Sequence, residues 1–222
     1  MTDANHVRTT RVAYDAGAER YAGWVGTEIN AAMEDPIDRA LLAAFVEMVH
    51  DHQGGTVADL GCGPGRVAAF LASGGIEVVG IDVSREMLIA ASTAHSSLPL
   101  AQATLAALPF RDGSLRAAVS WYSIIHTPPE LLDRVWAEVG RVVAQTGHLL
   151  IAFQAGGGEA LHRDEIFGQP ASLTSYRHAP THVEQSLVEA GFRVHARVVR
   201  APALAHETTP QAFVIASLDG PK

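Results

Sequence analysis

The stretch "VADLGCGPG", residues 57–65, changes from an apolar run into a turn that holds three glycines in five positions. Glycine loses more backbone freedom on folding than any other residue, which costs roughly 0.5–1 kcal/mol relative to alanine in an ordered element. A turn this rich in glycine therefore indicates that another group comes close to the backbone. The stretch predicts a buried strand, a tight turn and a helix that begins at Arg66.

The rest of the chain alternates between short apolar runs and helical segments. Strands separated by helices of about ten to fifteen residues predict βαβ units and a parallel sheet covered on both faces. The segment between the last two runs is too short for a helical crossover, so we expect these two strands to be antiparallel. The expected strands are residues 56–60, 76–82, 98–103, 115–122, 147–153, 192–200 and 211–217.

The 222 residues, 48% of them hydrophobic, suit a compact globular protein with a single domain over residues 1–222. Residues 1–53 form an N-terminal helical segment, with a first helix over about 8–24 and a second that begins near Pro36. Residues 154–180 are the longest stretch without a clear pattern. Long connections in compact domains are usually functional, so we expect a loop near the substrate there.

Composition excludes several kinds of partner. The net charge of −8, without a local run of basic residues, argues against nucleic acid and against an anionic membrane surface. Cys62 is the only cysteine, which excludes an intrachain disulfide and favours a reducing compartment. The first residues lack the apolar segment of a signal peptide, and no apolar run approaches the ~20 residues of a membrane span. We expect a cytoplasmic protein.

Asp82 ends the second expected parallel strand, beside the glycine turn. Open α/β sheets bind ligands outside the carboxyl ends of their strands, at the point where the strand order reverses. A carboxylate at that position can accept hydrogen bonds from both hydroxyls of a ribose. The simpler alternative is that Asp82 only caps the following helix, although Ser84 is the better N-cap.

Two kinds of ribose-containing ligand fit the turn: a dinucleotide or S-adenosylmethionine. The dinucleotide pattern G-x-G-x-x-G requires a third small residue where this chain has Arg66. Asp59, just before the turn, would repel a pyrophosphate but can orient an ammonium group. This favours S-adenosylmethionine, whose methionine end carries an ammonium. An NAD(P)-dependent oxidoreductase remains the alternative, and a non-catalytic S-adenosylmethionine-binding module is a third.

Four segments in succession, "VADLGCGPG", "VVGIDVSREML", "LPFRDGSLRAAVSWYSIIH" and "GHLLIAF", resemble the motifs of class I S-adenosylmethionine-dependent methyltransferases. The subgroup they resemble includes ubiquinone and menaquinone methyltransferases and many enzymes of small-molecule metabolism. The resemblance implies a Rossmann-like, seven-stranded, mostly parallel sheet with helices on both faces and an antiparallel C-terminal hairpin. It also implies methyl transfer to an oxygen, nitrogen or sulfur atom of a small-molecule acceptor by in-line displacement.

The resemblance places the cofactor along the carboxyl ends of the strands. It assigns the glycines to the methionine and ribose portion, Asp82 to the ribose hydroxyls, and Val83 and Met87 to the adenine face. Thr104 stands where the family usually has an aspartate that binds the adenine amino group, and the Leu105 N–H is available to a ring nitrogen. The expected cofactor residues are Tyr21, Asp59, Gly61, Gly63, Gly65, Asp82, Val83, Met87, Thr104 and Leu105.

Tyr21 and Tyr14 both lie in a segment similar to one in which a family tyrosine covers the methionine portion, and Tyr21 matches it better. His126 and Tyr122, at the end of the fourth strand, are the catalytic candidates, with His126 as a general base. The alternative for His126 is a structural histidine under a helix that begins at Pro128.

The expected loop adds candidate acceptor contacts, which are His162, Arg163, Phe167, Tyr176, Arg177 and His178. His178 and His182 have a spacing seen in metal sites, but Pro180 lies between them and no third ligand is evident. We therefore expect surface histidines and no bound metal.

Overall fold

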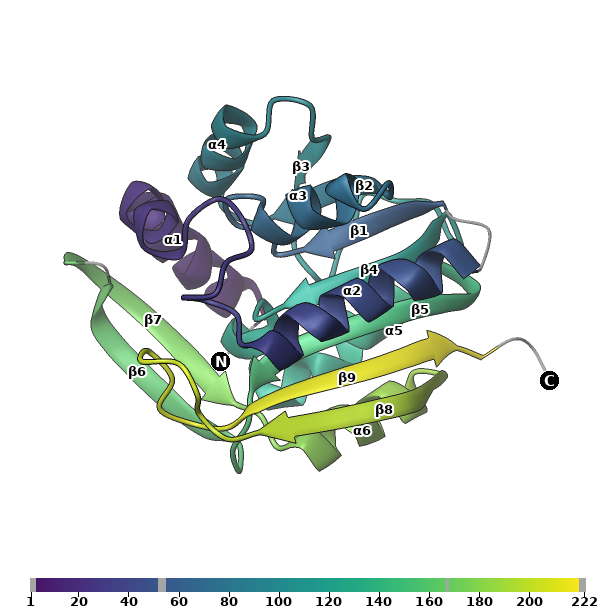
Figure 1. Cartoon of the computed structure of the whole chain (residues 1–222). Helices are drawn as coiled ribbons and strands as arrows, with labels where there is room; N and C mark the ends of the chain where they lie inside the picture. Colours follow the sequence, from purple (N-terminus) through teal and green to yellow (C-terminus); the bar gives the residue numbers. More distant parts are fainter. Residues whose placement is uncertain (1–2, 52–54, 167, 220–222) are drawn as a thin grey trace.

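A seven-stranded sheet runs through the middle of the protein, with helices on both faces (Figure 1). The computed structural model describes residues 3–51, 55–166 and 168–219. In spatial order the strands are β3 (Leu100–Gln102), β2 (Glu77–Asp82), β1 (Thr56–Leu60), β4 (Leu115–Trp121), β5 (Val143–Gln154), β9 (Gln211–Leu218) and β8 (Phe192–Arg200). The pairs from β3 to β5 are parallel, and β9 is antiparallel to both β5 and β8. The expected Rossmann-like sheet and its antiparallel C-terminal hairpin are confirmed.

The helices follow the expected order along the chain. They are α1 (Asp3–Val25), α2 (Pro36–Asp51), α3 (Arg66–Ser73), α4 (Arg85–Ala94), α5 (Leu132–Val142) and α6 (Pro180–Glu189). The helix expected from Pro128 begins later, because the chain first forms two short 3₁₀ turns, Ile124–His126 and Pro129–Leu131. None of the helices in these ranges combines the length and hydropathy that a membrane-spanning segment requires.

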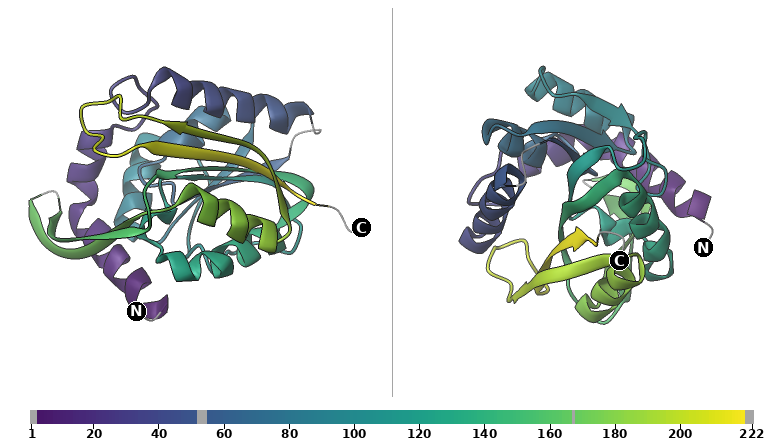
Figure 2. Two further views of the ribbon diagram at one scale, coloured as in Figure 1. Left: turned by 90° about the horizontal axis from the view of Figure 1, so that it is seen from below. Right: turned by 90° about the vertical axis from the view of Figure 1, so that its right-hand side faces the viewer.

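Side chains along the central strands alternate between the two faces of the sheet, so the apolar core has two layers. In β5, Leu149 and Ile151 join the apolar cluster under α5 and α6, whereas Leu150 and Ala152 join the cluster under α2 and α3. Successive side chains of a strand point to opposite faces, so one strand supplies both clusters. Figure 2 shows α2 (dark blue) and α6 (green) on opposite sides of the sheet.

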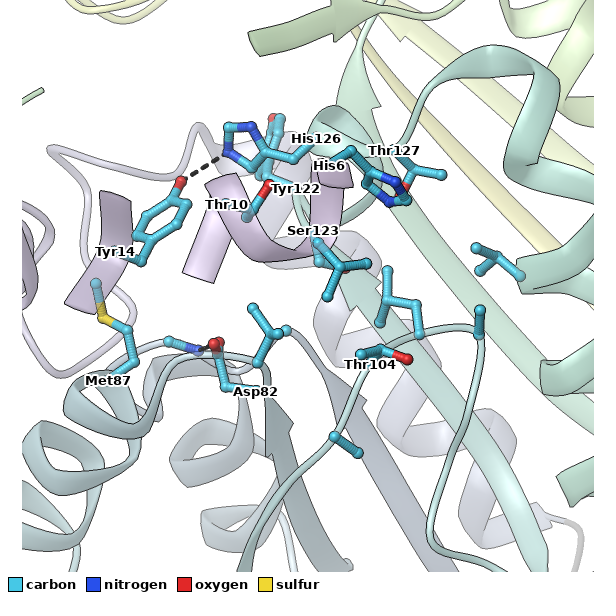
Figure 3. A pocket seen from close by; sticks show the side chains of 18 of the residues that line it. His6, Thr10, Tyr14, Asp82, Met87, Thr104, Tyr122, Ser123, His126 and Thr127 are labelled. Atoms are coloured by element: carbon cyan, nitrogen blue, oxygen red, sulfur yellow. Dashed lines mark hydrogen bonds between the residues drawn. The ribbon is translucent and has the colours of Figure 1, made fainter. Parts of the chain in front are cut away.

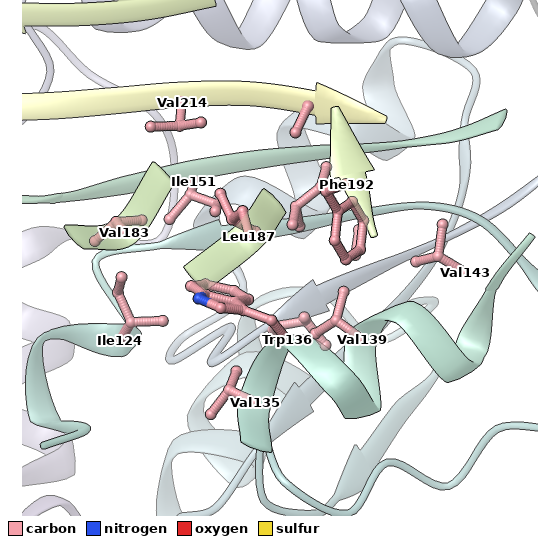
Figure 4. Close-up of a cluster of buried hydrophobic side chains, with 14 of the residues drawn as sticks. Ile124, Val135, Trp136, Val139, Val143, Ile151, Val183, Leu187, Phe192 and Val214 are labelled. Atoms are coloured by element: carbon pink, nitrogen blue, oxygen red, sulfur yellow. The ribbon is translucent and has the colours of Figure 1, made fainter. Parts of the chain in front are cut away.

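Trp136 of α5 is the largest fully buried side chain in the layer under α5 and α6 (Figure 4). Its ring packs among residues of α5, α6 and the sheet, and its indole N–H donates to the Ser186 hydroxyl at 2.9 Å. The bond satisfies a polar group that would otherwise be buried without a partner. Trp136 therefore joins the two helices to each other and to the sheet.

Residues 154–180, expected to be a loop, form a second sheet of two antiparallel strands, β6 (Glu159–Ile166) and β7 (Gln169–Arg177). Most side chains of β6 are exposed and most of those of β7 are half-buried, so the sequence lacks the apolar alternation of a half-buried strand. Its apolar contact is a small cluster of Ile166, Leu173 and Ala13 of α1. Figure 1 shows α1 and this hairpin together at the end of the sheet where β1 and β4 terminate.

Replacing Trp136 by alanine should lower the free energy of unfolding by about 3–5 kcal/mol, because it leaves a large cavity between α5, α6 and the sheet. Urea unfolding followed by circular dichroism measures the change. Val188 of α6 is 59% exposed, so Val188→Ala serves as the control and should change stability by no more than about 0.5 kcal/mol. Equal, small effects of both variants would contradict the packing described.

Candidate active site

Two glycines of the turn after β1 have left-handed backbone conformations that residues with side chains rarely adopt. Gly61 has φ +76°, and a Cβ there would lie 2.3 Å from the Cβ of Ser123. Gly63 has φ +52°, and a Cβ there would lie 3.7 Å from the Tyr21 ring. Left-handed backbone disfavours residues with side chains at both positions. At Gly61 the approach of Ser123 also leaves no room for a Cβ.

Gly65 serves packing between helices. It is the N-cap of α3 with φ +86°, and a Cβ there would lie 3.1 Å from the His95 ring and 3.3 Å from Ala91. It lies on the α4 side of the turn and does not line either of the cavities described below. The structure therefore does not bring Gly65 together with the other expected cofactor residues.

Asp82 joins the turn after β1 to the start of α4. One carboxylate oxygen accepts the Gly63 N–H and the other accepts the Ser84 N–H, each at 2.8 Å. Burial raises the pKa of Asp82 to about 6, although these backbone N–H groups act in the opposite direction. Ser84 is the N-cap of α4, as expected. Because a carboxylate oxygen has two lone pairs, each can accept one further hydrogen bond from a ligand.

Asp59 lies below the turn, with 1% of its surface exposed. Its Oδ2 accepts the Ala68 N–H of α3 at 2.9 Å, and burial raises the pKa of the carboxyl to about 7. Desolvation of this size favours the neutral acid unless a positive group is nearby. An ammonium group of a ligand would stabilise the charged form.

A first cavity of about 120 Å³ lies over the ends of β1, β2 and β4. Most of the expected site residues line it, with Asp82, Met87 and Thr104 on one side and Thr10, Tyr14 and His126 on the other (Figure 3). The expected residues at this cavity are Tyr21, Gly61, Gly63, Asp82, Val83, Met87, Thr104, Leu105, Tyr122 and His126. The sequence thus predicted most of the residues that meet here.

A second cavity of about 450 Å³ adjoins the first and falls within the usual range for ligand pockets. The two share residues of α1, of the glycine turn and of the end of β4, which are Tyr14, Tyr21, Gly61, Gly63, Trp121, Tyr122 and His126. Its farther wall comes from the β6–β7 hairpin and from His206, Glu207 and Gln211 near the start of β9.

One face of α1 covers both cavities. Thr10, Tyr14 and Tyr21 point into the site at helical spacing, and the Tyr14 and Tyr21 rings meet edge to face with centroids 5.5 Å apart. Asp15 fixes the helix to α4 by accepting the Ser84 hydroxyl at 2.6 Å. Tyr21 was expected here in preference to Tyr14, whereas both tyrosines line both cavities. The periodicity of residues 10, 14 and 21 was the signal that identifies this face.

His126 is half-buried between α1 and the hairpin. Its Nδ1 lies 2.9 Å from the Thr174 carbonyl oxygen, and its Nε2 lies 2.8 Å from the Tyr14 hydroxyl. A carbonyl only accepts, so Nδ1 carries the proton and Nε2 accepts from Tyr14. Burial lowers the pKa of His126 to about 4, which keeps the ring neutral near pH 7.

Tyr122 and Trp121 complete the centre of the site. Tyr122 has φ 58°, an uncommon conformation for a bulky residue that is often found at functional sites. Burial raises the pKa of its hydroxyl. The Trp121 indole N–H is buried and has no hydrogen-bond partner among the residues that the structure describes, although the side chain lines both cavities.

Arg66 explains why the turn departs from the dinucleotide pattern. Its guanidinium is buried and forms an ion pair with Glu34, and its Nε donates to the Glu28 carbonyl at 3.2 Å. These bonds attach the segment before α2 to the start of α3. The side chain therefore occupies the helix start that a dinucleotide pyrophosphate would approach.

Residues 154–180 were expected to supply several acceptor contacts. Of those that the structure describes, only Arg163 lines a cavity. Phe167 lies outside the described residues. His178, expected at the surface, is fully buried and its Nε2 donates to the Ile124 carbonyl at 3.0 Å. This correction follows from the hairpin, which carries His178 back beneath β5. No group of three metal-ligating side chains occurs in the described ranges.

Residues 57–147, from β1 into β5, match the family described as "Methyltransferase domain". These residues are similar to a methyltransferase domain. The resemblance to class I S-adenosylmethionine-dependent methyltransferases, expected from four motifs, is confirmed. The domain contains the glycine turn, Asp82, Thr104 and the end of β4, whereas α1 and the hairpin lie outside the matched range.

Two curated relatives are similar to part of the chain. A malonyl-[acyl-carrier protein] O-methyltransferase of Erwinia billingiae is 32% identical over 126 residues, which cover 54% of this chain and 47% of the relative. A demethylmenaquinone methyltransferase of Beutenbergia cavernae is 28% identical over 116 residues, covering 52% and 48%. The aligned part thus spans about half the length of these relatives.

The fold of the methyltransferase domain and its additions is shared with solved structures. One is a 1,6-didemethyltoxoflavin-N1-methyltransferase of Burkholderia thailandensis with bound 1,6-didemethyltoxoflavin and S-adenosylhomocysteine. It superimposes with a TM-score of 0.72 at 13% identity, over 99% of this chain and 92% of that chain. At this identity the likeness shows the fold.

Replacing His126 by glutamine should reduce the loss of stability in mild acid. The pKa of His126 in the folded protein is about 4, below its ordinary 6.5, so the unfolded chain binds more protons. The contribution of the neutral His126 ring to the free energy of unfolding is complete above about pH 6.5 and is lost as the pH falls through 4. Between pH 7 and 5 the native chain should lose about 2 kcal/mol more than His126→Gln in urea unfolding. Parallel pH profiles would contradict a half-buried, neutral His126.

Proposed function

We propose that the protein is an S-adenosylmethionine-dependent methyltransferase that transfers a methyl group to an oxygen, nitrogen or sulfur atom of a small-molecule acceptor. The observation that carries the proposal is the pair of adjoining cavities at the carboxyl ends of the strands. The first has the lining expected for the adenosyl portion of a cofactor, and the second has room for another molecule. The curated relatives are named as methyltransferases, which supports the same reaction class.

The residues at the first cavity fit the adenosyl part of S-adenosylmethionine. The free lone pairs of Asp82 are suited to the two ribose hydroxyls, and Val83 and Met87 offer apolar faces to the adenine ring. The Thr104 hydroxyl and the Leu105 N–H provide polar contacts at the ring edge. Each of these roles is expected from the sequence motifs. The position of each residue at the first cavity supports it.

The methionine portion fits the region shared by the cavities. Asp59, whose charged form is disfavoured by burial, would be stabilised by the cofactor ammonium. Gly61 and Gly63 leave space for a close approach to the backbone, and Tyr21 lies against Gly63. The unpartnered indole N–H of Trp121 supplies a donor near the same region.

S-adenosylmethionine, when bound, supplies a methyl group already activated by a positively charged sulfur. The protein contributes alignment of the acceptor, which in well-oriented reactions lowers a barrier by about 7–11 kcal/mol. Aromatic rings from α1 and from the end of β4 line the shared region, and the hairpin adds Ile166 and Leu173 to the wall of the second cavity. The net charge of −8 supports a small molecule over a nucleic acid as the acceptor.

We propose further that His126 receives the proton that the acceptor loses, with Tyr122 beside it. The unprotonated Nε2 of His126 faces the shared region, and the Nδ1–H bond to the Thr174 carbonyl holds the ring in the required tautomer. Its present partner at Nε2 is the Tyr14 hydroxyl, so the proton reaches His126 either directly, after Tyr14 moves, or through that hydroxyl.

The second candidate, an NAD(P)-dependent oxidoreductase, requires the start of α3 to hold a pyrophosphate. The Arg66–Glu34 ion pair lies at that helix start and Asp59 lies below it, so the arrangement favours S-adenosylmethionine. A screen for transfer of a radiolabelled methyl group to small-molecule acceptors separates the proposed enzyme from a binding module without activity.

Asp82→Asn should weaken binding of S-adenosylhomocysteine by about 10- to 100-fold, since a hydrogen bond to a charged group contributes roughly 1.5–3 kcal/mol. Isothermal titration calorimetry measures the affinity, and thermal unfolding without ligand shows whether the variant is folded. Glu77→Gln removes one negative charge from the exposed opposite end of β2 and should bind as the native chain does. Equal affinities for all three proteins would exclude a ribose contact at Asp82.

His126→Gln should lower kcat by about 10²- to 10⁴-fold, the usual contribution of a general base. The affinity for S-adenosylhomocysteine should change by less than about threefold, because the cofactor contacts assigned above do not include His126. Once an acceptor is identified, single-turnover methyl transfer measures the chemical step. Unchanged turnover in the variant would show that the acceptor reacts without this base.

A further inference from the structure

The β6–β7 hairpin places a positively charged side chain at the second cavity. Arg163 of β6 lines the second cavity, and no hydrogen bond or ion pair joins it to a residue that the structure describes. Its positive charge is close enough to Tyr14 and His126 to act on the pKa of both. A free guanidinium thus lies beside the proposed transfer centre.

Other charged groups at the second cavity are already compensated within the protein. Arg66 pairs with Glu34, and Glu207 accepts from Arg200 at 2.5 and 2.7 Å. Glu165, the next residue of β6 with a side chain at this cavity, lies beyond a register shift, nearer the turn of the hairpin. Arg163 is therefore the lining cation that remains available to a ligand near His126.

Ser175 on the paired strand β7 is a second polar group available at the same wall. It is 8% exposed, lines the second cavity, and its hydroxyl has no hydrogen-bond partner in the described part of the chain. Ile166 and Leu173, on the same two strands, add apolar surface beside it.

We propose that Arg163 determines specificity by binding an acidic group, a carboxylate or a phosphate, of the methyl acceptor, with Ser175 donating a second hydrogen bond. The apolar part of the acceptor then lies against Ile166, Leu173 and Trp24. A guanidinium binds such oxyanions with two parallel hydrogen bonds, which fixes the direction of the bound molecule as well as its affinity. This inference rests on the proposed methyltransferase function and names the acceptor class of that site.

The test uses the full chain saturated with S-adenosylhomocysteine and a panel of aryl and alkyl carboxylates, each paired with its primary amide. A matching set of phosphonates distinguishes carboxylate from phosphate recognition. Calorimetry should show that acids bind at least about tenfold more tightly than their amides. Arg163→Gln should abolish that preference, and Arg163→Lys, which keeps the charge, should restore part of it.

Arg193→Gln is the matched control, because it removes the same charge from the exposed far end of β8. It should retain the preference for acids. The proposal is overturned if no acid binds better than its amide, or if Arg163→Gln retains the preference. It is also overturned if Arg163→Gln weakens only S-adenosylhomocysteine, which would assign the guanidinium to the cofactor. Failure of the native chain to bind S-adenosylhomocysteine would instead reject the methyltransferase function itself.

Discussion

The carboxylate of Asp82 is the point on which the site depends. With one oxygen on Gly63 and the other on Ser84, it connects the turn after β1 to the start of α4. Both segments end at the same edge of the sheet because β1 and β2 are parallel neighbours. These two bonds hold the glycine turn beside the start of α4 at the first cavity. Under the proposed function, the remaining lone pairs of the same carboxylate bind the ribose.

Segments that are distant in the sequence complete the site around Asp82. α1 reaches α4 through Asp15 and Ser84, and it reaches the hairpin through Tyr14, His126 and Thr174. The part that matches the methyltransferase family supplies the floor, whereas α1 and the hairpin supply the cover and the farther wall. Under the proposed function, the shared floor binds the cofactor and the additions select the acceptor.

The sequence predicted the parts of the fold that rest on local patterns. The apolar runs identified all seven strands of the main sheet, because central parallel strands are buried on both faces. The hairpin was missed because its apolar contact is with α1, far away in the sequence. His178 was misplaced for the same reason, since its burial depends on how the hairpin returns to β5.

At the site, too, local motifs predicted some features, whereas others depend on contacts between distant parts of the chain. Gly61 and Gly63 were predicted by motif and lie at the cavities, whereas Gly65 follows the same pattern but serves the packing of α3 against α4. A spacing of glycines does not reveal what faces each of them. The availability of Arg163 and Ser175 likewise depends on which partners the folded chain provides, and only the structure shows this.

The most direct test of the account is a calorimetric titration of the unaltered protein with S-adenosylhomocysteine, with NADH as the comparison ligand. The account predicts saturable binding of one molecule of S-adenosylhomocysteine per chain and no heat of binding with NADH. No binding of S-adenosylhomocysteine, or saturable binding of NADH at the same site, would contradict it.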